Sequence, residues 1–505
     1  MEYDKKFPLS HNQKSLFFME RLISGKPVYN LSAAIRFGAE IDQAILKESM
    51  LDLFACNDAL KTVFVTEPAG VFQVIKKDMP FSVFNVEKAS EAEIMGMIET
   101  EKDRPFDLAE GPLVRAVLYQ KAEGCIVLIV MHHIISDFWT FAVLLKDLGY
   151  IYSQRVLGSK DYRSRITDKP SYELFVQRQE KILAQKTELA DYWRSVLSGE
   201  LPVLNLSTDR KRPPVQSFSG DRVEWTLSTE DSERIARICK QCGIGKHVFL
   251  LSVFQLLLQK YSGQDDILVG TLATGRTSLK LSEITGYFIN PVVVRGDLSG
   301  DPPFRVFLER IKQSALGAFA HKQYPFDLIV KQLELRRDLS VSPVFQALFA
   351  YQTLPHFIGS DAAAISAAAL NRSAVFDFEG IAAEYIPLAQ HTAQYDISLI
   401  TAELEEGMGL LLEYNSDLFD PETARRMLKH YETLLRSALD EPEKKLSELE
   451  ILDSEERDME LCAHNRTDML CEPLCLHQLI ERQAEHTPGS LALIFSEVSL
   501  TYREL

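Results

Sequence analysis

Two adjacent histidines, His132 and His133, begin the segment of the chain whose residue types could do chemistry, and Ser136 and Asp137 follow them closely. Imidazole is the side chain that most often serves as a general base near neutral pH. The carboxylate of Asp137, four residues after His133, could return through a tight turn and organise the loop. A purely structural role is the alternative, in which Ser136 or Asp137 caps a helix and the histidines are satisfied polar residues at a strand end.

The elements on either side of this segment would hold it rigidly. Residues 125–131 are an apolar run that predicts one buried strand, and residues 138–154 have helical periodicity. Reactive side chains are common on such strand-to-helix turns. Because successive strand residues point to opposite faces, we expect one histidine to be buried and hydrogen-bonded and the other to be free to meet a substrate.

The rest of the chain alternates helical and strand-like segments. Helices are predicted at residues 42–64, 172–197, 229–261, 304–319 and 421–439, and strands at 33–38, 114–119, 221–227, 267–271, 292–296, 347–352 and 409–414. Each half has a helix followed by strands, which two similar lobes would explain. Residues 159–170, 208–220 and 360–371 have the composition of connectors.

Composition narrows the class of protein. The net charge of −17 disfavours nucleic acid or anionic membrane as a partner. We find no signal segment and no apolar run of membrane-spanning length, so a cytoplasmic protein with reduced thiols is expected. Cys239 and Cys242 form a CxxC without a second pair or a matching histidine pair, and we therefore predict no metal site.

The segment from His132 to Asp137 resembles the HHxxxDG signature of condensation domains in nonribosomal peptide synthetases. Other stretches resemble further motifs of that family in the family's order, namely residues 9–18, 57–64, 171–175, 284–290, 321–327 and 337–343. The resemblance covers residues 7–452. Residues 465–505 resemble the linker and first segment of an adenylation domain, without its ATP-binding loop and without a carrier motif for phosphopantetheine.

This resemblance implies an α/β fold (an α+β sandwich) with two chloramphenicol-acetyltransferase-like lobes in a V-shaped pseudo-dimer. The expected boundaries are an N-terminal lobe at 1–175, a C-terminal lobe at 176–452, a linker at 453–470 and the start of an adenylation domain at 471–505. The implied reaction joins a thioester-bound acyl group to the amine of an aminoacyl acceptor.

The resemblance also implies the partners. The chain would bind no cofactor of its own, since its substrates are tethered to the phosphopantetheine of an upstream donor carrier and a downstream acceptor carrier. An adenylation domain would adjoin it. If Met1 is the natural start, the donor carrier arrives in trans.

For the site itself, the resemblance implies His133 as the catalytic residue, acting either as a base or as a positioning group. His132 would pack behind the loop. Asp137 would pair with a cation, for which Lys61 and Arg295 are the candidates. The expected residues of the substrate tunnel are Phe138, Trp139, Tyr287 and Asn290.

Phe138 departs from the family pattern, because it stands where the signature has glycine. It is either a core-facing aromatic on an altered loop or a side chain that reshapes the tunnel. Together with Trp139 and residues 290–293, it resembles condensation domains at polyketide–peptide junctions, which implies a polyketide or other acyl donor.

Three alternative functions compete with condensation. Heterocyclisation is disfavoured because both histidines are present, and epimerisation because an adenylation-like segment follows directly. A non-catalytic docking module that recruits carriers is the third, and the retention of His132, His133 and Asp137 argues against it.

Overall fold

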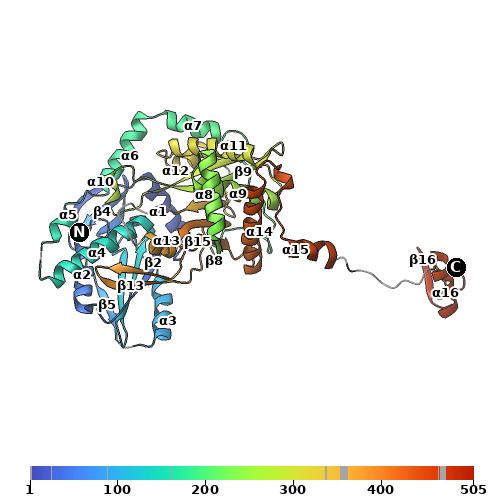
Figure 1. Ribbon diagram of the computed structural model, residues 1–505, viewed down its shortest axis with the longest axis horizontal. Coiled ribbons are helices and arrows are strands. Elements are labelled where there is room, and N and C mark those ends of the chain that lie inside the picture. The colour runs from blue at the N-terminus through green and yellow to red at the C-terminus, as the bar shows by residue number, and fades with distance from the viewer. Residues whose placement is uncertain are drawn as a thin grey trace. The chain divides into compact units, whose positions relative to one another are not determined.

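Two six-stranded mixed sheets organise the larger part of the chain (Figure 1). The computed structural model describes residues 3–23, 25–87, 89–159, 161–335, 338–352, 362–463, 466 and 474–505. It separates into two compact units, Met1–Ile451 and Leu452–Leu505. Both six-stranded sheets lie in the first unit, and each is the centre of one lobe.

The first lobe is built on a sheet that runs β12 (Ala374–Phe378), β13 (Ile381–Ile386), β2 (Asn30–Phe37), β7 (Cys125–His132), β6 (Val114–Gln120) and β5 (Val83–Val86). Only β5 and β6 pair in parallel. A small sheet adds β1 (Tyr3–Pro8), β4 (Gly70–Lys76) and β3 (Thr62–Glu67). The helices are α1 (His11–Ile23), α2 (Gln43–Cys56), α3 (Glu91–Lys102), α4 (Phe138–Val156) and the short α5 (Arg163–Thr167).

The second lobe has the sheet order β10 (Ile289–Asp297), β9 (Asp266–Thr274), β11 (Ala347–Tyr351), β14 (Ile397–Leu404), β15 (Gly407–Asn415) and β8 (Gly220–Leu227). Its helices are α8 (Thr229–Cys242), α9 (Lys246–Ser262), α10 (Leu279–Ser282), α11 (Phe304–Ala320), α12 (Phe326–Gln332), α13 (Ala362–Ala369) and α14 (Pro421–Asp440). Helix α6 (Glu173–Gln185) packs against residues of both lobes, and α7 (Glu188–Val196) packs on the core of the second lobe. The second unit contains α15 (Ser454–Asp458), α16 (Leu476–His486), β16 (Leu491–Phe495) and β17 (Val498–Thr501).

Three predicted helices were too long. The first ends at Cys56, because Asn57 takes an extended conformation and accepts from the amide of Ala59, and Thr62 then opens β3. Residues 229–261 form two helices bent by 105°, and Gly243 ends the first in the left-handed conformation with φ of 60°. Residues 172–197 likewise divide, where Lys186 leaves helical geometry.

The lobe boundary predicted at residue 175 is wrong for one hairpin. Strands β12 and β13 follow the first elements of the second lobe in sequence, yet β13 pairs antiparallel with β2 of the first lobe. In Figure 1, β13 is coloured orange and lies beside β2 from the blue end of the chain. The first sheet therefore needs residues 374–386, because they supply its outer two strands.

Strand β7, which carries the histidines, is buried along its whole length. Val127, Ile129 and Met131 face one hydrophobic cluster, which also contains side chains of α2 and α4. The alternate residues Ile126 and Leu128 face another, which contains side chains of α3. A strand covered on both faces reads as a continuous apolar run, which is why residues 125–131 are apolar without alternation.

No single helix among the described residues combines the length and the apolar character that a bilayer crossing requires. By those two measures alone, only the bent pair of α8 and α9 qualifies.

Candidate active site

The two histidines lie where β7 meets a single turn of 3-10 helix, His133–Ile135, which is followed by α4. The backbone amide of His133 donates to the carbonyl of Tyr29 at 2.7 Å. The hydroxyl of Ser136 donates to the carbonyl of His132 at 3.0 Å. These bonds close the turn. One of the two histidines is buried and the other is partly exposed.

His133 is the accessible one. Its Nδ1 lies 2.6 Å from the carbonyl oxygen of Ser136, which can only accept, so Nδ1 carries the proton. In a neutral imidazole the other nitrogen, Nε2, then keeps a free lone pair. The ring packs edge-on against Tyr287, with centroids 5.0 Å apart. The geometry therefore presents a proton acceptor at the contact between the two lobes.

Burial lowers the pKa of His133 below its ordinary value of 6.5, although the Ser136 carbonyl and the charge of Asp137 oppose the shift. The imidazole is thus neutral at physiological pH. In an NMR titration of histidine-labelled protein, the His133 resonance, assigned by comparison with His133→Gln, should have its midpoint below pH 6.5. Because the unfolded ring binds protons more readily, the same shift should lower the free energy of unfolding as pH falls through 6.5 toward the folded-state pKa. A midpoint at or above 6.5 would contradict this picture.

His132 is the buried one, with 1% of its surface exposed. Its Nδ1 accepts the backbone amide of Ile134 at 3.0 Å. The ring lies between Tyr29 and Phe106, at centroid distances of 6.3 and 6.1 Å. It packs behind the turn, on the side of Tyr29 and Phe106.

Asp137 has two structural roles. One carboxylate oxygen caps α4 by accepting the amide of Thr140 at 2.7 Å, and the same oxygen accepts from Arg276 at 2.9 Å. The other oxygen accepts the amide of Phe288 at 3.2 Å. Asp137 therefore joins the turn that carries the two histidines in the first lobe to the second lobe.

Arg276 is the cation that sequence reasoning missed. Its side chain is fully buried, and it also donates to the carbonyls of Leu281 and Ile284 at 3.0 and 2.5 Å. The guanidinium lies 3.9 Å from the centroid of the Phe288 ring. It follows β9 directly and lies in none of the motifs, so only its place in the fold identifies it.

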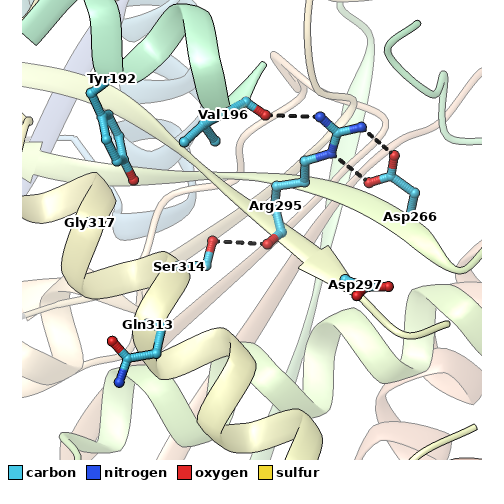
Figure 2. A pocket seen from close by; sticks show the side chains of 8 residues that line it. All are labelled: Tyr192, Val196, Asp266, Arg295, Asp297, Gln313, Ser314 and Gly317. Carbon is cyan, nitrogen blue, oxygen red and sulfur yellow. Dashed lines mark hydrogen bonds and ion pairs between the residues drawn. The ribbon is translucent and has the colours of Figure 1, made fainter. Parts of the chain in front are cut away.

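The two cations expected for Asp137 are elsewhere. Lys61 forms an ion pair with Asp58 at 3.1 Å. Arg295 makes a two-pronged contact with Asp266 and donates to the carbonyl of Val196, as Figure 2 shows. Both expectations are wrong, because nearer carboxylates hold these side chains.

Further contacts fix the second lobe against the turn. The hydroxyl of Thr140 donates to the carbonyl of Gly286 at 2.8 Å, and the hydroxyl of Tyr172 donates to the carbonyl of Tyr287 at 2.5 Å. Gly286 is required here, since a Cβ would lie 2.2 Å from the Tyr172 ring and φ is 153°. This close approach brings Tyr287 to His133.

Three tyrosines lie close to one another, and one of them, Tyr287, packs against His133. Tyr29, Tyr287 and Tyr395 interact electrostatically with one another, and burial raises the pKa of each. They are therefore protonated donors at neutral pH. Within the part of the chain that the structure describes, none of the three hydroxyls has a hydrogen-bond partner. The hydroxyls are thus free to donate, and that of Tyr287 belongs to the ring that contacts His133.

The other tunnel residues have the following surroundings. Phe138 is the partly exposed first residue of α4 and has helical geometry, so no strain results from its replacing glycine. The indole of Trp139 donates to the carbonyl of Ser282 at 2.9 Å. Asn290 donates to the carbonyls of Lys322 and Tyr324, both at 2.9 Å. Their tunnel role stays a prediction, and Asn290 also ties β10 to the segment before α12.

A separate cavity of about 550 Å³ opens in the second lobe (Figure 2). Arg295 and Asp266 line it together with residues of α7 and α11. It contains none of the residues placed around His133. Among the described residues, no group of histidine, cysteine and carboxylate side chains is suited to hold a metal ion.

The family model described as Condensation domain matches residues 3–460 of this chain. The chain belongs to that family of nonribosomal peptide synthetase domains, and the resemblance of its motifs is confirmed. The match ends before the segment that resembles an adenylation domain.

Individual relatives agree with this assignment. The chain is 34% identical to a linear gramicidin synthase of Brevibacillus parabrevis over 99% of its own length and 6% of the relative. It is 30% identical to bacitracin synthase 2 of Bacillus licheniformis, over 99% of this chain and 18% of that protein. The chain thus spans less than a fifth of the length of these relatives.

Solved structures share the fold. A four-domain nonribosomal peptide synthetase, bound to AMP and glycine, superimposes with a TM-score of 0.83 at 21% identity over 100% of this chain and 38% of that one. The X-domain from teicoplanin biosynthesis gives 0.77 at 23% identity, over 90% and 99%. The mixed α/β fold with two lobes is therefore the fold of condensation domains.

Proposed function

We propose that this chain catalyses amide bond formation between an acyl thioester donor and the amine of an aminoacyl acceptor. Both substrates would be carried on the phosphopantetheine arms of partner carrier domains. The observation that carries the proposal is the imidazole of His133, whose Nδ1 is bound to the carbonyl of Ser136, whose Nε2 is left free, and whose ring packs against Tyr287 of the second lobe.

The chemistry suits these groups. The amine nitrogen attacks the thioester carbonyl carbon and a C–N bond forms. Nε2 of His133 accepts the proton that the nitrogen loses, the C–S bond breaks, and the proton passes to the departing thiolate. A thioester carbonyl is already electrophilic, so holding the two tethered reactants in line supplies much of the acceleration. The gain from holding the reactants is the same whether His133 acts as a base or as a positioning group.

The phenols supply a second contribution. As the carbonyl oxygen gains negative charge, a protonated hydroxyl of Tyr29, Tyr287 or Tyr395 would donate to it. These donors are fixed before the reaction, since Tyr29 and Tyr287 are buried. The pair of Asp137 and Arg276 keeps the segment that carries Tyr287 against the turn that carries His133.

We also propose that residues 471–505, of which the structure describes 474–505, belong to an adjoining adenylation domain. The supporting observation is the hairpin of β16 and β17, whose apolar residues Leu493, Ile494 and Phe495 are exposed. Apolar side chains gathered on one short hairpin are expected to contact further protein.

A condensation assay tests the function. The protein is incubated with carrier-bound aminoacyl, fatty acyl and polyketide-like donors and with aminoacyl carriers as acceptors, and amide is detected by intact mass. We expect amide with at least one pair, and the preferred donor decides the acyl class. Carrier binding without amide from any pair would instead favour a docking module, and the fold does occur in a complex of the teicoplanin X-domain with OxyB.

A further inference from the structure

A buried carboxylate lies behind the catalytic turn and has no part in the reaction described above. Oε2 of Glu20, on α1, lies 3.4 Å from Nε2 of His132, and the two side chains are 13% and 1% exposed. Both atoms are buried, and neither has a hydrogen-bond partner among the described residues. A buried polar atom without a partner is costly, so the two atoms are each other's available partner.

The hydrogen bonding of His132 determines where its proton lies. Nδ1 accepts the amide N–H of Ile134 at 3.0 Å, so Nδ1 cannot itself carry a proton. The ring is therefore neutral, with its proton on Nε2, and that N–H is directed to Glu20. The carboxylate accepts from Nε2–H, stabilises this tautomer and makes Nδ1 the better acceptor for Ile134.

Helix α1 thus holds the residue after His133 at both backbone groups. The side-chain amide of Gln13, also on α1, donates to the carbonyl of Ile134 at 3.1 Å. Glu20 acts on the amide N–H of Ile134 through His132. The apolar rings of Tyr29 and Phe106 surround His132, which strengthens such interactions because water is kept out.

We propose that Glu20 is a positioning residue for condensation. By fixing the tautomer of His132, it fixes the 3-10 turn and hence the aim of Nε2 of His133. The inference rests on the proposed role of His133. If Glu20 were replaced by glutamine, the new NH₂ group could donate to Nε2 of His132. The ring proton would then move to Nδ1, where it would oppose the N–H of Ile134.

The first measurement uses the wild-type protein, so it does not depend on a variant folding. In ¹⁵N-labelled protein, long-range correlations of the histidine rings should show His132 as the Nε2–H tautomer at neutral pH. An Nδ1–H tautomer would overturn the proposal and leave the role of His133 untouched.

The second measurement compares Glu20→Gln with Glu432→Gln. Glu432, on α14, is the control because its side chain is 14% exposed, close to the 13% of Glu20, and it accepts from Arg436 at 2.7 Å, away from His132. We expect Glu20→Gln to lower kcat by about 10- to 100-fold with little change in KM, and to populate the Nδ1–H tautomer of His132. Glu20→Asp, which keeps the carboxylate, should retain the tautomer and regain part of the rate.

Two results would overturn the proposal. One is a wild-type rate in folded Glu20→Gln. The other is a lost rate with the His132 tautomer and the His133 resonances unchanged, which would mean that Glu20 serves only stability. Retained activity in His133→Ala would instead refute the proposed role of His133, and no amide from the wild-type protein with any pair of carriers would refute the proposed function, so these failures are distinguishable.

Discussion

Replacing His133 with alanine is expected to lower the rate of amide formation by about 10²- to 10⁴-fold, because general acid–base groups contribute on that scale. The variant loses the acceptor Nε2, whose availability depends on the bond from Nδ1 to Ser136. Some rate should survive, since the two tethered substrates are still held together. The measurement is single-turnover amide formation with one donor and one acceptor carrier.

His247→Phe is the matched control for this variant. His247, like His133, is a partly exposed imidazole whose pKa is lowered by burial, in this case to about 4, but it lies on α9 and contacts Thr271. Phenylalanine preserves its aromatic contacts with Phe319 and Phe349. We expect near wild-type rates per folded molecule. If His133→Ala fell no further than this control, His133 would not be the catalytic residue.

Replacing Arg276 with methionine should destabilise the protein by about 3–5 kcal/mol, because Asp137 would be left as a buried charge without its partner. Arg276→Lys should cost less, since it keeps the charge but loses the forked donor that reaches Asp137 and the carbonyls of Leu281 and Ile284 together. Urea unfolding measures both changes. Condensation should fall as well, because the two lobes meet through this contact.

Arg194→Met is the control for charge and chain length. Its pair with Asp191, at 2.5 Å, has both side chains about two-thirds exposed, at 64% and 66%. An exposed pair of this kind is worth about 0–1 kcal/mol. The double variant Asp137→Asn with Arg276→Met should recover part of the loss, since no unpaired charge is left. If Arg276→Met lost no more free energy of unfolding than Arg194→Met, the buried pair of Asp137 and Arg276 would not be what holds the two lobes together.

Local segments were predicted well where one physical cause dominates. The apolar run at residues 125–131 became β7 because both faces of the strand are covered, and α4 begins at Phe138 because Asp137 caps it. Errors occurred where a helical pattern continued past a turn, as after Cys56 and at Gly243. There the chain leaves the helix through local hydrogen bonding and glycine geometry, which periodicity does not record.

The sequence by itself determined the family, the strand-to-helix frame of the site and the accessible and buried roles of the two histidines. Each depends on residues near in sequence or on a motif that can be read directly. Only the tertiary structure decided that Arg276, 139 residues beyond Asp137, is its partner, and that Glu20 stands behind His132. Only the tertiary structure showed, too, that the hairpin of residues 374–386 completes the first sheet. In the sequence, many cations and carboxylates are equally able to pair. Only the folded chain brings particular ones within bonding distance, and the other cations pair with carboxylates that lie nearer to them.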